Sequence, residues 1–241
     1  YCIVDEASQA TLPSVLGPIA LARKFILCGD HMQLPPLVRA EAAVEGGLAV
    51  SLFETLARDA PHAVATLATQ YRMNEEIQRI PNRTVYDGRL VCGSAIVRDS
   101  ELALPDFQPS KEFPWIDAAV EPSSRVLFID TDALPDAGEC PSASSFYNPA
   151  EAQINALLFC SLDPGQIGVI AAYKPQVAQI SEVLASMSLK IPRNTQKESP
   201  VEVSTVDRFQ GRDKDCIIVS FVRSNTHGAI GALLADWRRL N

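Results

Sequence analysis

Several features are missing from this 241-residue sequence, and each absence narrows the class of protein. No apolar run approaches the roughly 18 residues that a membrane-spanning helix needs, so no membrane partner is expected. The sequence also contains no internal repeat and no low-complexity tract. Its apolar fraction of 47% is instead that of a globular, core-forming protein.

A basic excess and paired cysteines are also missing. The net charge of −8 argues against a large nucleic-acid-binding face, although a narrow basic channel, or a face completed by further segments, remains compatible with it. The six cysteines are scattered, without a C-x-x-C pair. They are therefore interpreted as small buried residues of a reducing compartment rather than as a metal site.

The sequence starts inside an apolar run, without Met or a signal peptide, so we expect it to be an excised part of a longer protein. It also lacks a G-x-x-x-x-G-K-[ST] loop, which cradles phosphates in P-loop ATPases. If the protein hydrolyses ATP, that loop is expected upstream of Tyr1. Residues 1–68 would then expose a sheet edge and apolar faces.

What the sequence does contain is a short apolar run, residues 1–4, that leads directly into Asp5 and Glu6. Such a run is typical of a buried strand in a parallel sheet. Because ligands of open α/β sheets bind at the carboxyl ends of strands, we expect both carboxylates near a nucleotide. In phosphoryl-transfer ATPases one such carboxylate holds Mg²⁺, and a second can polarise the attacking water. Most Asp-Glu pairs are solvated surface charges. This pair suggests a nucleotide site because it directly follows an apolar run.

Apolar runs and helical patterns alternate along the chain, which predicts parallel α/β sheets with helices on both faces. Further strands are predicted at 24–28, 64–67, 126–130, 167–172, 201–203 and 216–222. Helices are predicted to begin at Thr11 or Leu12, and at Ser51, Asn74 and Asn148, and another carries the apolar stripe between Val177 and Met187. Pro81 is expected to end or bend its helix. Residues 88–124 and 190–200 are predicted to be irregular.

Four polar clusters, around Asp5, Asp30, Tyr71 and Gln210, follow apolar runs, which suggests one site assembled from several loops. The amide of Gln33 is suited to sense a γ-phosphate or its water, although a satisfied loop amide is the commoner case.

Three other residue types in these clusters suit a nucleotide, and each also has an ordinary structural explanation. Arg72 could bind phosphate oxygens, or be a surface charge. Tyr71 could stack on a base, or belong to the core. Gln210 and Gly211 could bring backbone amides close to phosphate, or form an ordinary turn.

These clusters, in this order, resemble the motifs of superfamily 1 helicases of the up-frameshift (1B) branch. The similar segments are 5–9 (motif II), 29–36 (motif III), 70–73 (motif IV), 205–213 (motif V) and 238–241 (the lead-in to motif VI). Residues 70–93, 220–225 and 233–241 are most similar to the nuclease–helicases that process Okazaki fragments and resected DNA ends. The resemblance covers nearly the whole chain.

The resemblance implies a RecA-like P-loop NTPase fold of two lobes, with ATP between them and single-stranded nucleic acid across the top. Residues 1–68 would be the C-terminal part of lobe one. Residues 69–241 would form most of lobe two, with an irregular insert at about 88–124.

The resemblance also implies a role for each site residue. Asp5 would handle Mg²⁺, Glu6 would activate water, and Gln33 and Arg72 would contact the γ-phosphate. The remaining implied nucleotide contacts are Tyr71, stacked on adenine, and Gln210, Gly211 and Asp213 from lobe two. Many relatives have Glu where Asp213 stands, one methylene longer. The motif VI arginine finger would lie beyond Asn241.

The implied function is that of an ATP-dependent 5′-to-3′ DNA helicase motor in a nuclear replication and repair nuclease–helicase. Its cofactors would be ATP and Mg²⁺, and its partner single-stranded DNA. An iron–sulfur cluster would belong to a nuclease domain outside this chain. Two alternatives stay open: an RNA helicase of the same branch, and a degenerate motor fold that serves as a protein-binding scaffold. Without the phosphate loop and the arginine finger, the 241 residues alone are expected to be inactive.

Overall fold

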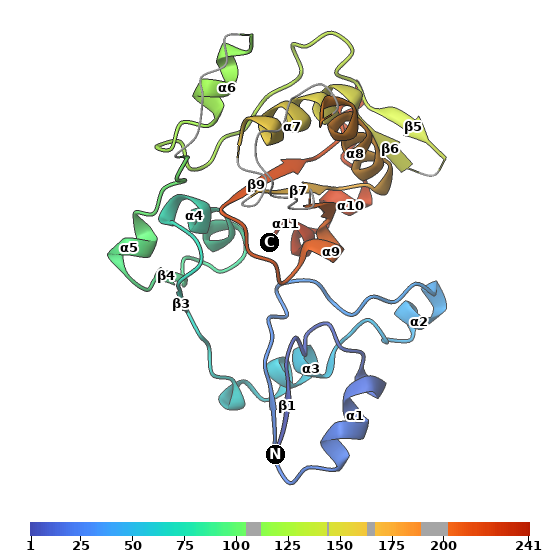
Figure 1. Cartoon of the computed structure of the whole chain (residues 1–241). Helices are drawn as coiled ribbons and strands as arrows, with labels where there is room; N and C mark the ends of the chain where they lie inside the picture. The colour runs from blue at the N-terminus through green and yellow to red at the C-terminus, as the bar shows by residue number, and fades with distance from the viewer. Residues whose placement is uncertain (105–111, 144, 163–166, 189–201) are drawn as a thin grey trace. The chain divides into compact units, whose positions relative to one another are not determined.

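The structure is a computed structural model that describes residues 1–104, 112–143, 145–162, 167–188 and 202–241 (Figure 1). These residues divide into two compact units. Unit 1 comprises Tyr1–Gln70, Pro81–Val91 and Asp236–Asn241, and unit 2 comprises Tyr71–Ile80 and Cys92–Ala235. In the described ranges, no helix has the length and apolar character needed to cross a membrane.

Most elements of unit 1 are short. The helices and strands that lie entirely in this unit are β1 (Cys2–Val4), α1 (Leu12–Ala20), β2 (Phe25–Leu27), α2 (Glu41–Glu45), α3 (Leu52–Asp59), the 3-10 helix η1 (Pro61–Ala63), β3 (Thr69–Gln70) and α11 (Trp237–Leu240). Helix α4 (Glu75–Thr84) and strand β4 (Val91–Cys92) contribute residues to both units. Unit 2 also holds α5 (Ala95–Arg98), α6 (Pro114–Ala119), β5 (Cys140–Ser142), β6 (Ser145–Tyr147), α7 (Pro149–Ser161), β7 (Ile167–Ala171), α8 (Lys174–Ser188), β8 (Glu202–Thr205), α9 (Val206–Phe209), β9 (Cys216–Ser220) and α10 (Gly231–Ala235).

The two predicted strands of unit 1 form and pair as expected, but they are not buried. β1 and β2 are parallel, with Ile3 opposite Ile26. Ile3 is 68% exposed and Ile26 is 50% exposed, so the prediction of buried strands is wrong for these residues. The reason is that each strand pairs only with the other among the described residues. The exposure agrees with the expectation that residues 1–68 leave apolar faces uncovered.

Two helices of unit 1 begin where the sequence predicts. α1 starts after Thr11, whose side chain makes no capping hydrogen bond, and has Pro13 in its first turn, a position that suits the fixed φ of proline. α3 starts after Ser51, whose Oγ accepts a hydrogen bond from the Glu54 backbone N–H at 3.1 Å. This bond satisfies one of the N–H groups that a helix start leaves without an intrahelical partner.

Unit 2 is organised around β7, which pairs in parallel with β8 on one side and β9 on the other (Figure 1). Ile167, Val169 and Ala171 of β7 are almost completely buried. They belong to an apolar core cluster, to which α7 and α8 also contribute. A continuous apolar run is what a strand covered on both faces requires, so the predicted parallel strand is confirmed.

Helices α7 and α8 follow their sequence patterns. Asn148 caps α7, and its Oδ1 accepts a hydrogen bond from the Glu151 N–H at 3.1 Å. On α8, Ile180 and Leu184 are buried in the apolar cluster, with Val177 and Val183 packed against it. The predicted apolar stripe therefore faces the core.

Several local predictions differ from the structure. Residues 126–130 are all described and form no strand; Ile129 packs against the core, but Phe128 is largely exposed. The strand predicted at 64–67 is instead the short β3, a few residues later. α4 begins after Asn74 as expected but continues past Pro81 to Thr84.

The segment predicted to be irregular, 88–124, contains α5 and α6 among its described residues. Pro114 is the first residue of α6, and Ile116 and Val120 lie one turn apart in the core of unit 2. The segment is therefore not purely surface. Residues 105–111 of it, the loop predicted at 190–200, and Val201 of the predicted 201–203 strand lie outside the described residues.

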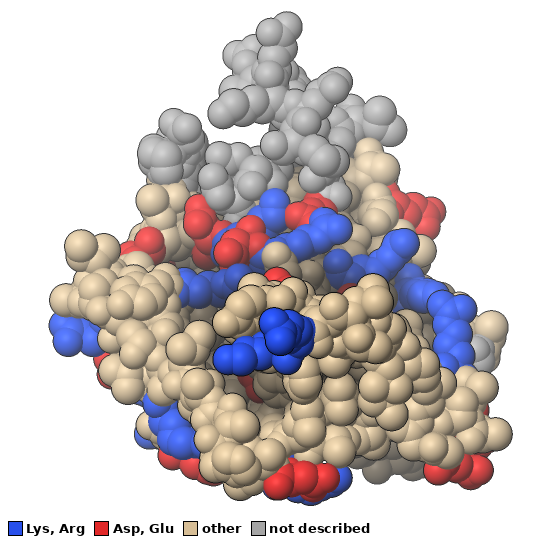
Figure 2. Space-filling model, turned by 90° about the horizontal axis from the view of Figure 1, so that it is seen from below, with Lys and Arg blue, Asp and Glu red and all other residues tan. Residues whose placement is uncertain are grey.

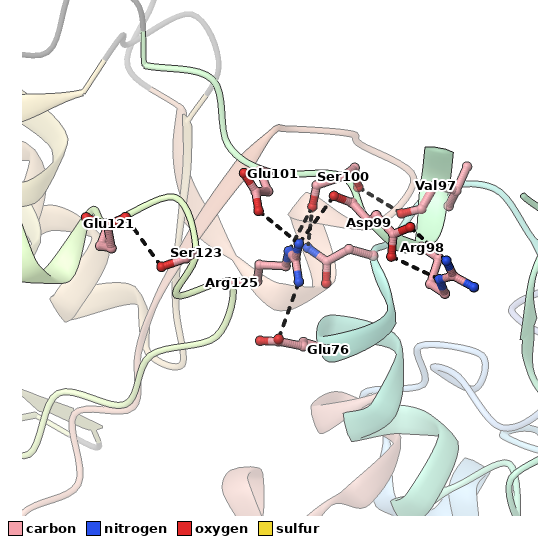
Figure 3. Close-up of polar contacts among 10 residues, drawn as sticks. Glu76, Val97, Arg98, Asp99, Ser100, Glu101, Glu121, Ser123 and Arg125 are labelled. Carbon is pink, nitrogen blue, oxygen red and sulfur yellow. Dashed lines mark hydrogen bonds and ion pairs between the residues drawn. The ribbon is translucent and has the colours of Figure 1, made fainter. Parts of the chain in front are cut away.

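Arg125 fastens the segment around α5 to α4 within unit 2 (Figure 3). Its guanidinium donates to the backbone carbonyls of Ser100 and Asp99 at 3.1 and 3.3 Å. It also forms ion pairs with Glu101 at 3.0 Å and with Glu76 of α4 at 3.4 Å. The planar, multi-donor guanidinium suits this role because one side chain satisfies several acceptors.

Candidate functional site

Asp5 and Glu6 lie at the carboxyl end of β1, as the sequence predicts. Asp5 Oδ1 accepts a hydrogen bond from the Glu6 N–H at 3.0 Å, and Glu6 Oε2 accepts one from Gln9 Nε2 at 2.8 Å. Both acidic residues are exposed. Glu6 has a left-handed backbone, with φ of 49°, which turns the chain sharply away from the strand. The turn presents two carboxylates together at a parallel strand end.

The 29–33 loop lies directly beside this turn. The Ala7 N–H donates to the Cys28 carbonyl at 2.8 Å, and the Asp30 N–H donates to Ser8 Oγ at 3.4 Å. A Cβ on Gly29 would lie 3.0 Å from the backbone nitrogen of Ser8, so only glycine allows this approach without a shift. The structure therefore brings together the segments that resemble motifs II and III.

Gln33 is the residue of this loop predicted to sense phosphate. Its Nε2 donates to Asp30 Oδ2 at 3.2 Å, and Asp30 Oδ1 accepts from the Met32 N–H at 2.9 Å. An ionised carboxylate only accepts hydrogen bonds, so the NH₂ end of the Gln33 amide must face Asp30. The neighbouring His31 ring lies 6.0 Å from the Phe53 ring, a packing contact that fits a structural role.

Arg72 and Asp213, from the segments that resemble motifs IV and V, meet within unit 2. Arg72 Nε lies 2.6 Å from Asp213 Oδ1, and the two side chains are 62% and 68% exposed. Exposed ion pairs contribute only about 0–1 kcal/mol, so little free energy opposes exchanging this contact for a phosphate contact. The sequence placed both residues at one site, and the structure brings these two together.

Gln210 and Gly211 follow α9, which directly continues β8. Phe209 is buried, and its ring occupies the space beside Gly168 of β7, where a Cβ would overlap it. This contact fixes the start of the 210–213 segment on the sheet. Gly211 has a φ of 76°, a left-handed conformation that by itself favours glycine. The ordinary turn explanation is thus sufficient for Gly211 without a ligand.

The eight predicted residues are divided between the units, and each group is described by itself. Asp5, Glu6 and Gln33 belong to unit 1; Tyr71, Arg72, Gln210, Gly211 and Asp213 belong to unit 2. Within the described ranges, no group of three or more His, Cys, Asp or Glu side chains could hold a metal ion. A Mg²⁺ ion bound through ATP phosphates needs only one or two protein carboxylates, and the Asp5 oxygens suit it.

Sequence reasoning missed two polar arrangements. In unit 2, Glu139 Oε2 accepts from Arg223 Nε at 2.6 Å, from the Ser224 N–H at 3.1 Å and from Asn225 Nδ2 at 3.3 Å. Burial alone would raise the pKa of Glu139, but the hydrogen bonds from Arg223 and Asn225 hold it below its usual value. In unit 1, Tyr86 joins the 29–33 loop. No local pattern signals either contact, because the partners are more than 50 residues apart.

The chain matches known protein families over almost its whole length. Two family models, both described as AAA domain, match residues 1–41 and 48–241. Such domains imply a P-loop NTPase fold, and the α/β chain with its small parallel sheets is consistent with it. Similar proteins include the DNA replication ATP-dependent helicase/nuclease DNA2 of Xenopus laevis (44% identical), the dna2 protein of Schizosaccharomyces pombe (42%) and DNA2 of Homo sapiens (41%).

These similarities cover all of the present chain but only 17% of the S. pombe protein and 23% of the other two. The chain thus spans about a fifth of the length of these curated relatives. The family models together leave only residues 42–47 unmatched. The chain therefore belongs to the AAA domain family, as a superfamily 1B helicase segment similar to the DNA replication helicase/nucleases.

Proposed function

We propose that this chain is part of the motor of an ATP-dependent 5′-to-3′ DNA helicase, in a nuclease–helicase of replication and repair. The motor would couple ATP hydrolysis to movement on single-stranded DNA. The observation that carries the proposal is the pair Asp5 and Glu6 at a parallel strand end, beside the loop that holds Gln33. The similarity of the whole chain to DNA replication helicase/nucleases supports it.

The proposed roles in unit 1 follow from chemistry and position. Asp5 would bind Mg²⁺, which neutralises charge on the transferred phosphoryl group when it is bound with ATP. Glu6, one residue further along the same turn, would accept a proton from the attacking water. The Gln33 amide can donate to a γ-phosphate oxygen and accept from that water. All three roles proposed for unit 1 would serve the hydrolysis step.

The proposed roles in unit 2 concern nucleotide binding. Arg72 would leave Asp213 and bind the γ-phosphate, and the exposed ring of Tyr71 would stack on adenine. Gln210, Gly211 and Asp213 would contact the nucleotide from the same unit. We further propose that residues 1–68 and 69–241 belong to two RecA-like lobes that enclose ATP.

We propose single-stranded DNA as the nucleic-acid partner and the nucleus as the location, both by analogy with the DNA replication helicase/nucleases. Figure 2 shows basic side chains interspersed with acidic ones on one face, with wide areas of neither charge. An iron–sulfur cluster, if the whole protein has one, would be held by residues outside this chain.

The 241 residues alone are proposed not to hydrolyse ATP, because the sequence lacks the G-x-x-x-x-G-K-[ST] loop that cradles phosphates. The test is an ATPase assay with and without single-stranded DNA, on this chain and on the full-length protein. Activity that is stimulated by DNA only in the full-length protein is expected. Equal stimulation by matched DNA and RNA strands would favour an RNA helicase, and robust activity of the chain alone would require a different phosphate site.

A further inference from the structure

Tyr86 lies just after α4, and its hydroxyl joins three segments of unit 1 that are far apart in the sequence. The hydroxyl donates to Asp30 Oδ2 at 2.5 Å and accepts from Asn241 Nδ2 at 2.8 Å. Gln33 Nε2 donates to the same Asp30 oxygen at 3.2 Å. Tyr86 is half-buried, so these bonds are only partly in competition with water. One hydroxyl thus contacts the loop that carries the proposed phosphate sensor and the end of the chain.

Asp30 shares its carboxylate between Tyr86 and Gln33. Its Oδ2 accepts from both the Tyr86 hydroxyl and Gln33 Nε2, while Oδ1 holds the Met32 N–H. Without the hydroxyl, this carboxylate would lose its shortest hydrogen bond and could rotate or draw in water. The direction in which Gln33 presents its amide depends on that carboxylate. Tyr86 is therefore connected to Gln33 through Asp30.

Asn241 adds a second tie to the same loop. Its Nδ2 donates to the Met32 carbonyl at 2.9 Å as well as to the Tyr86 hydroxyl. Residues 236–241 are also fastened to α3, because Arg238 lies 3.2 Å from Glu54 Oε1 and both side chains are about a quarter exposed. The 30–33 loop and residues 236–241 are thus connected through the side chains of Tyr86 and Asn241.

We propose that Tyr86 is a positioning residue, whose hydroxyl, together with Asn241, orients the Gln33 amide through Asp30 and couples that amide to residues 236–241. The proposal rests on the proposed function, in which Gln33 contacts the γ-phosphate or its water. A purely structural tyrosine would contribute packing through its ring, which phenylalanine keeps. The hydroxyl is needed only for the polar contacts.

The experiment uses the full-length protein and a double-mutant cycle of Tyr86→Phe and Gln33→Ala, with kcat and KM for ATP and the melting temperature measured for each variant. Tyr86→Phe is expected to lower kcat about tenfold and to change KM less than about twofold, a loss equivalent to one hydrogen bond to a charged group. In the Gln33→Ala background the same substitution should change kcat less than about twofold. Tyr147→Phe, in β6 of unit 2, is the matched control for loss of a hydroxyl and should leave kcat unchanged.

Full activity of Tyr86→Phe, or an equal loss in both backgrounds, would overturn the proposal. If Tyr86→Phe lowers the melting temperature strongly, Asn241→Ala replaces Tyr86→Phe in the double-mutant cycle. Full activity of Asn241→Ala, or an equal loss of kcat in both backgrounds, would then overturn the proposal. Glu6→Gln is measured in parallel. Wild-type turnover by Glu6→Gln would contradict the proposed function. An inactive Glu6→Gln together with a fully active Tyr86→Phe would contradict only the role proposed for Tyr86.

Discussion

The ring of Tyr71 lies against the Cα of Gly93, so close that a Cβ at position 93 would overlap the ring. Tyr71 is nevertheless 69% exposed. Gly93 follows β4, and both residues belong to unit 2. The missing side chain of Gly93 thus leaves room for an exposed aromatic ring, and an exposed ring is available to stack on a base.

Gly93→Ala should therefore displace the Tyr71 ring and weaken ATP binding in the full-length protein. Aromatic stacking contributes about 0.5–1.5 kcal/mol, so KM for ATP should rise about 2- to 12-fold, with kcat at saturation little changed. Steady-state kinetics over a wide ATP range measure both values. Gly17→Ala, in α1 where a Cβ meets no atom within 4 Å, is the matched control. An unchanged KM would mean that Tyr71 does not stack on adenine.

Glu6→Gln should block ATP turnover and leave ATP binding nearly intact. The glutamine keeps the shape of the side chain at the end of β1 but cannot take a proton from water. Loss of a general base costs roughly 10²–10⁴ in rate. Single-turnover hydrolysis and equilibrium binding of ATP, measured on the same preparation of the full-length protein, separate the two effects. A mutant that binds ATP and hydrolyses it at the wild-type rate excludes Glu6 as the base.

Arg72→Ala should slow hydrolysis more than it weakens ADP binding, because ADP lacks the γ-phosphate that the guanidinium is proposed to bind. The comparison is between kcat and the ADP dissociation constant of the full-length protein. Asp213→Asn is informative beside it, since it removes the carboxylate that pairs with Arg72 at 2.6 Å. Its melting temperature should stay close to the wild-type value, because exposed ion pairs contribute little. Equal losses of ATP and ADP affinity in Arg72→Ala would place Arg72 at the base, ribose or inner phosphates.

Glu139→Gln should destabilise unit 2 at neutral pH by on the order of 1–3 kcal/mol, because three donors lose a charged acceptor. The folded-state pKa of Glu139 is lowered, so its contribution is complete above its unfolded pKa of about 4.3 and is lost as the pH falls through the folded value. The stability difference between wild type and mutant should accordingly shrink in acid. Urea unfolding at a series of pH values from 7 to 3 measures it. A difference that is constant across this range would show that the charge of Glu139 is not what matters.

Features that depend on residues three or four positions apart could be predicted from the sequence. The caps Ser51 and Asn148 accept bonds from backbone groups three residues on, so these helix starts need no knowledge of the rest of the fold. The same holds for the apolar stripe of α8. The continuous apolar run of β7 likewise predicts its burial. Each of these signals is contained in one short stretch.

Predictions that depend on contacts with distant parts of the sequence were less accurate. The apolar run 126–130 has the composition of a strand but forms none, because no described strand pairs with it. Ile116 lies in a proline-punctuated stretch, yet it is buried, since α6 places it against the core. The composition of a segment limits which secondary structures it can adopt. Whether the segment pairs as a strand or becomes buried depends on which other segments the fold places beside it.

For the candidate site, the residue types already predict the chemistry: two adjacent carboxylates at a strand end, an amide, an arginine, an aromatic ring and a glycine turn. The pairing of Asp213 with Arg72, and the contacts of Tyr86 and Asn241 with the 30–33 loop, could be found only in the folded chain. This difference follows from the range of the interactions. A residue type fixes what a side chain can donate or accept, whereas partners 56 to 209 residues away are chosen by how the chain folds back on itself.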